Sequence, residues 1–117
     1  MEKTITIDGR GVKFRATAGV PRLYRIKFGR DIIQDMEEIQ KALKKNTEDG
    51  EAVPPKALEL FEDVAYIMAK HADKDAVPGT PEEWLDTFNT FSIYQIFPEI
   101  IDLWGLNMAS TSKAKKK

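Results

Sequence analysis

The chain has 117 residues, of which 42% are apolar and 32% are charged. These proportions are typical of a globular domain, and a chain of this length can bury one hydrophobic core without disulfides or metals. Because the sequence contains no cysteine and a single histidine, it excludes disulfide bonds, thiolate nucleophiles and cysteine-based or multi-histidine metal sites. We therefore expect neither a metal nor another cofactor.

Neither a membrane-spanning segment nor a signal peptide is predicted. No apolar run reaches the roughly 18 residues that a transmembrane helix needs. The first residues, Met1 to Thr4, lack the apolar region of a signal peptide. We therefore expect a cytoplasmic protein.

The formal net charge of −1 hides three blocks of opposite sign. Residues 1–30 carry a net charge of +6, residues 31–112 carry −11, and residues 113–117 add +4. Such a separation favours binding to a partner of complementary charge or to another copy of the chain. We interpret the two large blocks as complementing each other within one fold or between copies, with nucleic-acid binding as the less favoured alternative.

The N-terminus has the pattern of a β-hairpin over residues 3–16. Apolar and polar residues alternate on both sides of the turn-forming residues 8–11. Two strands alone are marginally stable, so a helix or a strand from a second copy should cover them. The residues expected on the apolar face are Ile5, Ile7, Val12, Phe14 and Ala16.

Four or five helices are predicted within residues 20–106, which makes the fold class α+β in a mostly helical single domain spanning 1–106. Pro21 and Gly29 have the spacing of a helix start and stop, and Thr80 with Glu83 has the spacing of an N-terminal cap. Pro98 should either break the late apolar helix or bend it. The remaining predicted segments are a helix from Asp31 to Asn46, a loop at 46–55, a helix at 56–72, an apolar stretch at 91–106 and a disordered Lys-rich tail at 107–117.

The residue types that carry catalysis are not arranged in a recognisable pattern. The glycines around Arg10 lack the third glycine and the strand-to-helix context of a dinucleotide-binding loop. His71 lies at the end of a predicted helix, where capping by an imidazolium would account for it. Carboxylate pairs, Glu62-Asp63 among them, are interpreted as solvated helix faces. We therefore predict a non-enzymatic domain that binds protein.

Several segments along the chain together resemble one protein family. These segments are Gly9 to Arg22, Tyr24-Arg25, Phe28 to Asp31, Leu60 to Glu62, Ala65-Tyr66, Thr80 to Leu85 and Ile100 to Trp104, which precede a Lys-rich end. Over residues 3–106 the chain resembles the tail assembly chaperones of long-tailed phages and prophages of Gram-positive bacteria.

The resemblance implies a protein that binds the tape measure protein, keeps it soluble and helps to recruit tail tube subunits, but is absent from the finished virion. It also implies a homo-oligomer and a longer product, made by a programmed ribosomal frameshift, that contacts the tail tube protein. Lys115, Lys116 and Lys117 fit this, because lysine codons are rich in adenine and adenine runs are slippery. If no slippery run precedes the stop codon, the frameshift prediction is wrong.

We predict contact residues for this function, each of which has an equally good interpretation as part of the core. For the tape measure protein they are Phe91, Tyr94, Phe97, Ile101 and Trp104, followed by Leu23 and Phe28. For self-association they are Ile5, Ile7, Val12, Phe14, Arg22 and Arg25. Two alternatives stay open: a small nucleic-acid-binding regulator that uses the basic first block and tail, and a structural head–tail component that would remain in purified particles.

Overall fold

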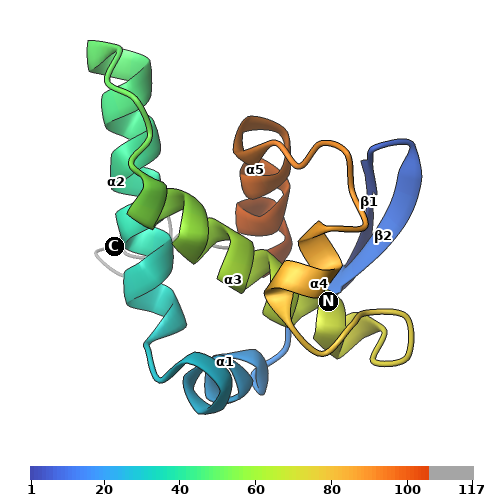
Figure 1. Cartoon of the computed structure of the whole chain (residues 1–117). Coiled ribbons are helices and arrows are strands. Elements are labelled where there is room, and N and C mark those ends of the chain that lie inside the picture. The colour runs from blue at the N-terminus through green and yellow to red at the C-terminus, as the bar shows by residue number, and fades with distance from the viewer. Residues whose placement is uncertain (106–117) are drawn as a thin grey trace.

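A two-stranded hairpin and five helices make up residues 1–105, the part of the chain that the computed structural model describes (Figure 1). The elements are β1 (Glu2–Ile7), β2 (Arg10–Arg15), α1 (Val20–Phe28), α2 (Ile32–Asp49), α3 (Pro55–Ala72), α4 (Pro81–Leu85) and α5 (Ile93–Trp104). This order confirms the predicted α+β class. The tail predicted to be disordered, 107–117, lies outside the described residues.

The hairpin is closed by a two-residue turn, Asp8-Gly9. Both residues have positive φ angles, 57° and 78°, which are characteristic of the turn that matches the natural twist of a hairpin. The resulting antiparallel register pairs Ile5 with Val12 and Ile7 with Arg10. Ile5, Ile7 and Phe14 are buried, as their alternation predicted.

Helix α3 forms the centre of the fold and packs against β2, α1, α2, α4 and α5 (Figure 1). Its sequence is apolar on most sides, and ten of its residues are buried. A helix of this kind needs neighbours all around it, which explains why the other elements gather on it. The hairpin thereby obtains the helical cover that two strands require.

Helices α1 and α2 begin and end at residues whose chemistry suits those positions. Pro21 lies in the first turn of α1, and Gly29 ends that helix in the left-handed conformation. The Asp31 carboxylate accepts a hydrogen bond from the Ile33 backbone N–H at 2.9 Å and so caps α2.

The predicted end of α2 is wrong by one turn. The helix continues through the polar residues after Asn46 and stops at Asp49, because Gly50, with φ 72°, supplies the left-handed C-cap. The predicted loop at 46–55 is therefore shortened to residues 50–54. This last turn of α2 projects beyond the rest of the domain (Figure 1).

Helix α4 and its flanking loops place an aromatic cluster beneath the hairpin. The Thr80 hydroxyl accepts a hydrogen bond from the Glu83 backbone N–H at 3.2 Å, which confirms the predicted cap. Trp84 is buried with its ring centroid 6.3 Å from that of Phe14 and 5.9 Å from that of Tyr66. Edge-to-face contacts of this kind hold strand, α3 and α4 together.

Helix α5 is continuous through Pro98, so the break that the sequence left open does not occur there. Proline lacks the backbone N–H that would otherwise bond to the Tyr94 carbonyl, and both residues lie on the exposed side of the helix. Helix α5 packs against α3 and β1.

Candidate protein-binding surface

Helix α1 turns apolar and basic side chains toward solvent. Its buried side is formed by Val20 and Tyr24. Away from this side, Ile26 is 73% exposed and Leu23 is 38% exposed. Residues three or four positions apart lie side by side on a helix, so these two form a short apolar ridge. Together with the exposed Arg22 and Arg25, they make up what we call the α1 face.

Phe28, which was predicted to contact a partner, is the last residue of α1 and packs against Tyr24 of the same helix. Its ring centroid lies 4.9 Å from that of Tyr24, and the Arg30 guanidinium carbon lies 5.4 Å from its ring centroid. Half-buried in this way, Phe28 contributes to the position of α1 more than to its exposed surface.

A partly buried polar cluster fixes α1 relative to α2 and α3. We call it the arginine cluster, and it consists of Tyr24, Arg30, Asp35 and Asp63. The Arg30 guanidinium donates to Asp35 at 2.9 Å, to Asp63 at 2.6 Å and to the Tyr24 hydroxyl at 3.1 Å. The Tyr24 hydroxyl in turn donates to Asp35 at 2.5 Å. Each bond crosses between different segments of the chain, so the cluster orients the α1 face.

The pKa shifts in the cluster follow from burial and pairing. Burial and the hydrogen bond to Asp35 raise the pKa of Tyr24, so its hydroxyl stays a donor. Burial by itself lowers the pKa of Arg30, but its bonds to Asp35 and Asp63 outweigh that effect and raise it. Burial also raises the pKa of Asp63, although Arg30 opposes this. The arginine therefore stays charged and holds both carboxylates.

The interpretation of Asp63 as part of a solvated helix face is wrong, because its side chain is buried against Arg30. A signal was present in the sequence. Asp63 lies among the apolar residues Leu60, Val64 and Ile67, and a carboxylate on such a stripe needs a cationic partner.

Helix α5, which carries most of the predicted contact residues, is largely core. Tyr94 is 58% exposed and remains available to a partner. Phe97 is 2% exposed, so it is withdrawn from the contact surface. Ile101 and Trp104 are half-buried, and the Trp104 indole N–H donates to the Met68 sulfur at 3.2 Å.

Phe91 belongs to the aromatic cluster around Trp84. Its ring centroid lies 5.3 Å from that of Phe61 and 5.2 Å from that of Trp84. These contacts leave it half-buried. Phe91 and the four candidates in α5 therefore do not form one exposed face.

The residues predicted to mediate self-association fall into two groups. The side chains of Ile5, Ile7 and Phe14 are buried in the core, and Val12 is half-buried. Association through the hairpin would therefore use its backbone edges. The other two candidates, Arg22 and Arg25, are exposed on the α1 face and remain accessible to a second copy.

His71 does not cap α3 as an imidazolium, contrary to the sequence-based interpretation. The C-cap is Asp73, whose backbone N–H donates to the Ala69 carbonyl. The His71 Nε2 atom lies 3.0 Å from the Thr17 hydroxyl oxygen, which ties α3 to the segment before α1. Burial, together with the charges of Arg15 and Lys74, lowers the pKa of His71.

This lowered pKa predicts a loss of stability in mild acid. Because folding favours the neutral ring, the unfolded chain binds more protons once the pH falls below the ordinary histidine pKa of 6.5. The stabilising contribution is therefore present above that pH and decreases as the pH falls toward the lower pKa of the folded state. Urea unfolding between about pH 7.5 and 5 should show a steeper loss for the wild type than for His71→Gln. Parallel curves would contradict this assignment.

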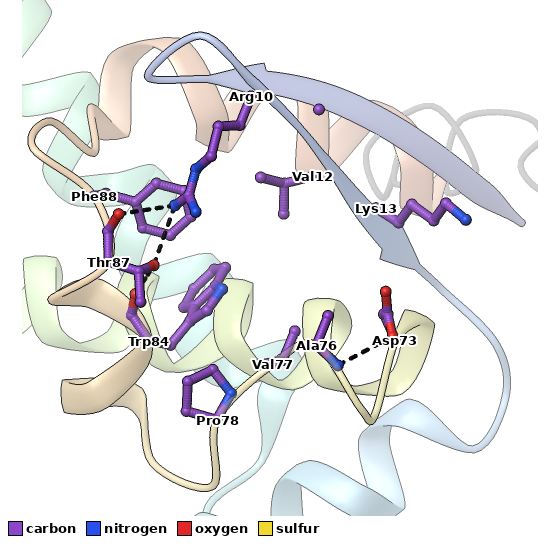
Figure 2. A pocket seen from close by; sticks show the side chains of 11 residues that line it. Arg10, Val12, Lys13, Asp73, Ala76, Val77, Pro78, Trp84, Thr87 and Phe88 are labelled. Atoms are coloured by element: carbon purple, nitrogen blue, oxygen red, sulfur yellow. Dashed lines mark hydrogen bonds between the residues drawn. The ribbon is translucent and has the colours of Figure 1, made fainter.

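A groove separates β2 from the segment that joins α3 to α4 (Figure 2). It has a volume of about 220 Å³ and is walled by Val12, Val77, Pro78, Trp84 and Phe88. At one end, Arg10 donates to the Thr87 carbonyl and hydroxyl oxygens at 3.0 and 3.1 Å, and its guanidinium carbon lies 4.2 Å from the Phe88 ring centroid. We call this feature the hairpin groove. Its walls come from residues far apart in the chain, so the sequence held no local signal for it.

The part of the chain that the structure describes contains neither a metal-binding cluster nor a membrane-spanning helix. Residues 1–105 contain no group of three or more histidine, cysteine, aspartate or glutamate side chains that could hold a metal ion. Within the same residues, no helix combines the length and the apolar character that crossing a membrane requires.

The chain was also compared with known proteins. No protein-family model, no curated protein and no solved structure matches it.

Proposed function

We propose that the chain is a non-enzymatic tail assembly chaperone of a phage or prophage. In the cytoplasm of the host bacterium it binds the tape measure protein, keeps it soluble and helps to recruit tail tube subunits, and it is absent from the finished virion. The observation that carries this proposal is the α1 face, where an apolar ridge is exposed beside two arginines. The resemblance of residues 3–106 to this family supplies the identity of the partner.

The α1 face has the chemistry for binding a helical partner. Leu23 and Ile26 can pack on the apolar stripe of an amphipathic helix, while Arg22 and Arg25 pair with carboxylates beside that stripe. One ridge of two side chains buries little area, so a single contact is weak. A long helical client therefore needs many copies bound side by side, whose combined contacts give stable coverage.

The charge distribution supports stacking of these copies. The α1 face is positive, whereas residues 31–112 carry a net charge of −11. Contact between the basic surface of one copy and the acidic surface of the next would form an open, head-to-tail array along the client. A longer frameshifted product would add the part that engages the tail tube protein.

Exchange of Ile26 for aspartate tests this function. Co-expression with the wild-type chain should move the tape measure protein from the pellet to the supernatant, whereas Ile26→Asp should leave most of it in the pellet. The substitution puts a carboxylate into the apolar ridge without touching the core, since Ile26 is 73% exposed. The measurement is the soluble fraction of the tape measure protein.

Tyr94→Asp serves as the matched control, because Tyr94 is the other large apolar side chain exposed on a helix within residues 1–105 besides Leu23. It should keep the client soluble. If Tyr94→Asp leaves the tape measure protein in the pellet while Ile26→Asp keeps it soluble, the contact lies on α5 rather than on α1. If the wild type does not change the soluble fraction, the proposed function is wrong.

A further inference from the structure

The outer edge of β2 has backbone groups without partners among the described residues. Met1 and Ala16 exchange two backbone hydrogen bonds, at 3.0 and 2.7 Å, which identifies them as a hydrogen-bonded pair. Because such pairs alternate along an antiparallel ladder, the backbone N–H and C=O groups of Gly11, Lys13 and Arg15 point away from β1. No described residue bonds to these groups.

The edge of β1 differs, because α5 lies along it. The Gln95 side-chain amide donates to the Thr6 carbonyl at 2.9 Å. Lys3 forms ion pairs with Glu99 and Asp102 of the same helix. Of the two edges of this sheet, only that of β2 is open to a further strand.

The hairpin groove lies next to this open edge. Gly11 and Lys13 line it together with Val77, Trp84 and Phe88 (Figure 2). In a strand added beside β2, alternate side chains would point to opposite sides of the sheet. Those on one side would enter the groove, where the walls are apolar and Val12 is half-buried.

The other side of the added strand would meet positive charge. Lys13 is exposed there, and Arg15 is half-exposed while paired with Glu2 at 3.2 Å. Two β2 strands from two copies would place these cations close together, which is unfavourable. A strand with carboxylates on that side is favoured instead. Asp73 also lies on the groove wall, but its carboxylate is engaged within the chain, because it accepts a hydrogen bond from the Ala76 backbone N–H at 3.2 Å.

We infer that the outer edge of β2 binds an extended segment of a partner protein by strand addition, with an apolar side chain in the hairpin groove and acidic side chains beside Lys13. This binding surface is separate from the α1 face, and the inference does not depend on the proposed function. Main-chain hydrogen bonds provide the attraction, and the groove and the lysine select the sequence.

The test uses a capped hexapeptide in which glutamate alternates with valine, titrated into the full chain by calorimetry. Binding should slow hydrogen exchange of the Gly11, Lys13 and Arg15 amides, measured by NMR. Lys13→Pro removes an outward N–H and leaves the β1–β2 ladder intact, so it should weaken binding about tenfold. Thr4→Pro is the matched control, since Thr4 pairs with Lys13 in the register and its N–H points outward from β1. It should leave the affinity unchanged.

A charge reversal provides a second measurement in case Lys13→Pro disturbs the hairpin. Lys13→Glu should weaken binding of the glutamate–valine peptide and strengthen binding of a lysine–valine peptide. The inference is overturned if the wild type binds neither peptide, if both proline variants bind alike, or if the β2 amides gain no protection.

Discussion

Replacement of Arg30 by methionine is expected to lower the free energy of unfolding by about 3 kcal/mol. The substitution leaves Asp35 and Asp63 buried without their cation and breaks the contacts of the arginine cluster with Tyr24. We expect a value at the lower end for a broken buried ion pair, because a third of the Arg30 side chain, 33%, remains exposed to water. Urea unfolding followed by circular dichroism measures the change.

Arg25→Met is the matched control for this prediction. Arg25 is an arginine of the same segment, but it is exposed and forms no ion pair within the described residues. Its replacement should change the unfolding free energy by less than about 0.5 kcal/mol. Equal effects of the two substitutions would show that the arginine cluster does not hold α1 in place.

Truncation of Phe14 to alanine should cost about 3–5 kcal/mol, the largest effect that we expect from a single substitution. Phe14 is fully buried between the hairpin and α3, and its ring meets Trp84 edge to face. Without the ring, a cavity remains, because β2, α3 and α4 are each held by other contacts and cannot close it completely. Thermal and urea unfolding both report this loss.

Val12→Ala gives the comparison on the same face of the same strand. Val12 is half-buried at the hairpin groove, so its truncation should cost no more than about 1 kcal/mol. A loss for Phe14→Ala as small as that for Val12→Ala would contradict the role of Phe14 as the link between hairpin and helices.

Local patterns predicted those parts of the fold that local chemistry decides. Alternation and the Asp8-Gly9 turn determine the hairpin, and Thr80 with Glu83 determines the start of α4. The end of α2 was misplaced because Asn46 and Gly50 both suit a helix end, and the glycine adopts the left-handed conformation more readily.

Contacts between distant segments limited the prediction of the candidate site. The arginine cluster joins Arg30 to Asp63, 33 residues apart, so neither residue reveals its partner in the sequence. The hairpin groove likewise depends on how Val12 and Phe88 meet. In α5, by contrast, the helical spacing could have separated Tyr94 from Phe97. Tyr94 shares a side with the polar, exposed Asp102, whereas Phe97 lies with the buried Ile93 and Ile100.

Some residues of the α1 face were named as candidates from the sequence. Leu23 was predicted to contact the client, and Arg22 and Arg25 to mediate association between copies. The exposure of Ile26 was not predicted, although its spacing from Val20 and Tyr24 places it off their buried side. The structure shows that this side of α1 faces water.

The mass of the complex with the tape measure protein is the most direct test of the proposed chaperone function. Sedimentation equilibrium of the co-purified complex should give the mass of one tape measure chain plus many copies of a 13.3 kDa subunit. It should fall as salt screens the contacts between copies. A chain that sediments alone, while the tape measure protein is found in the pellet, would contradict the function that we propose.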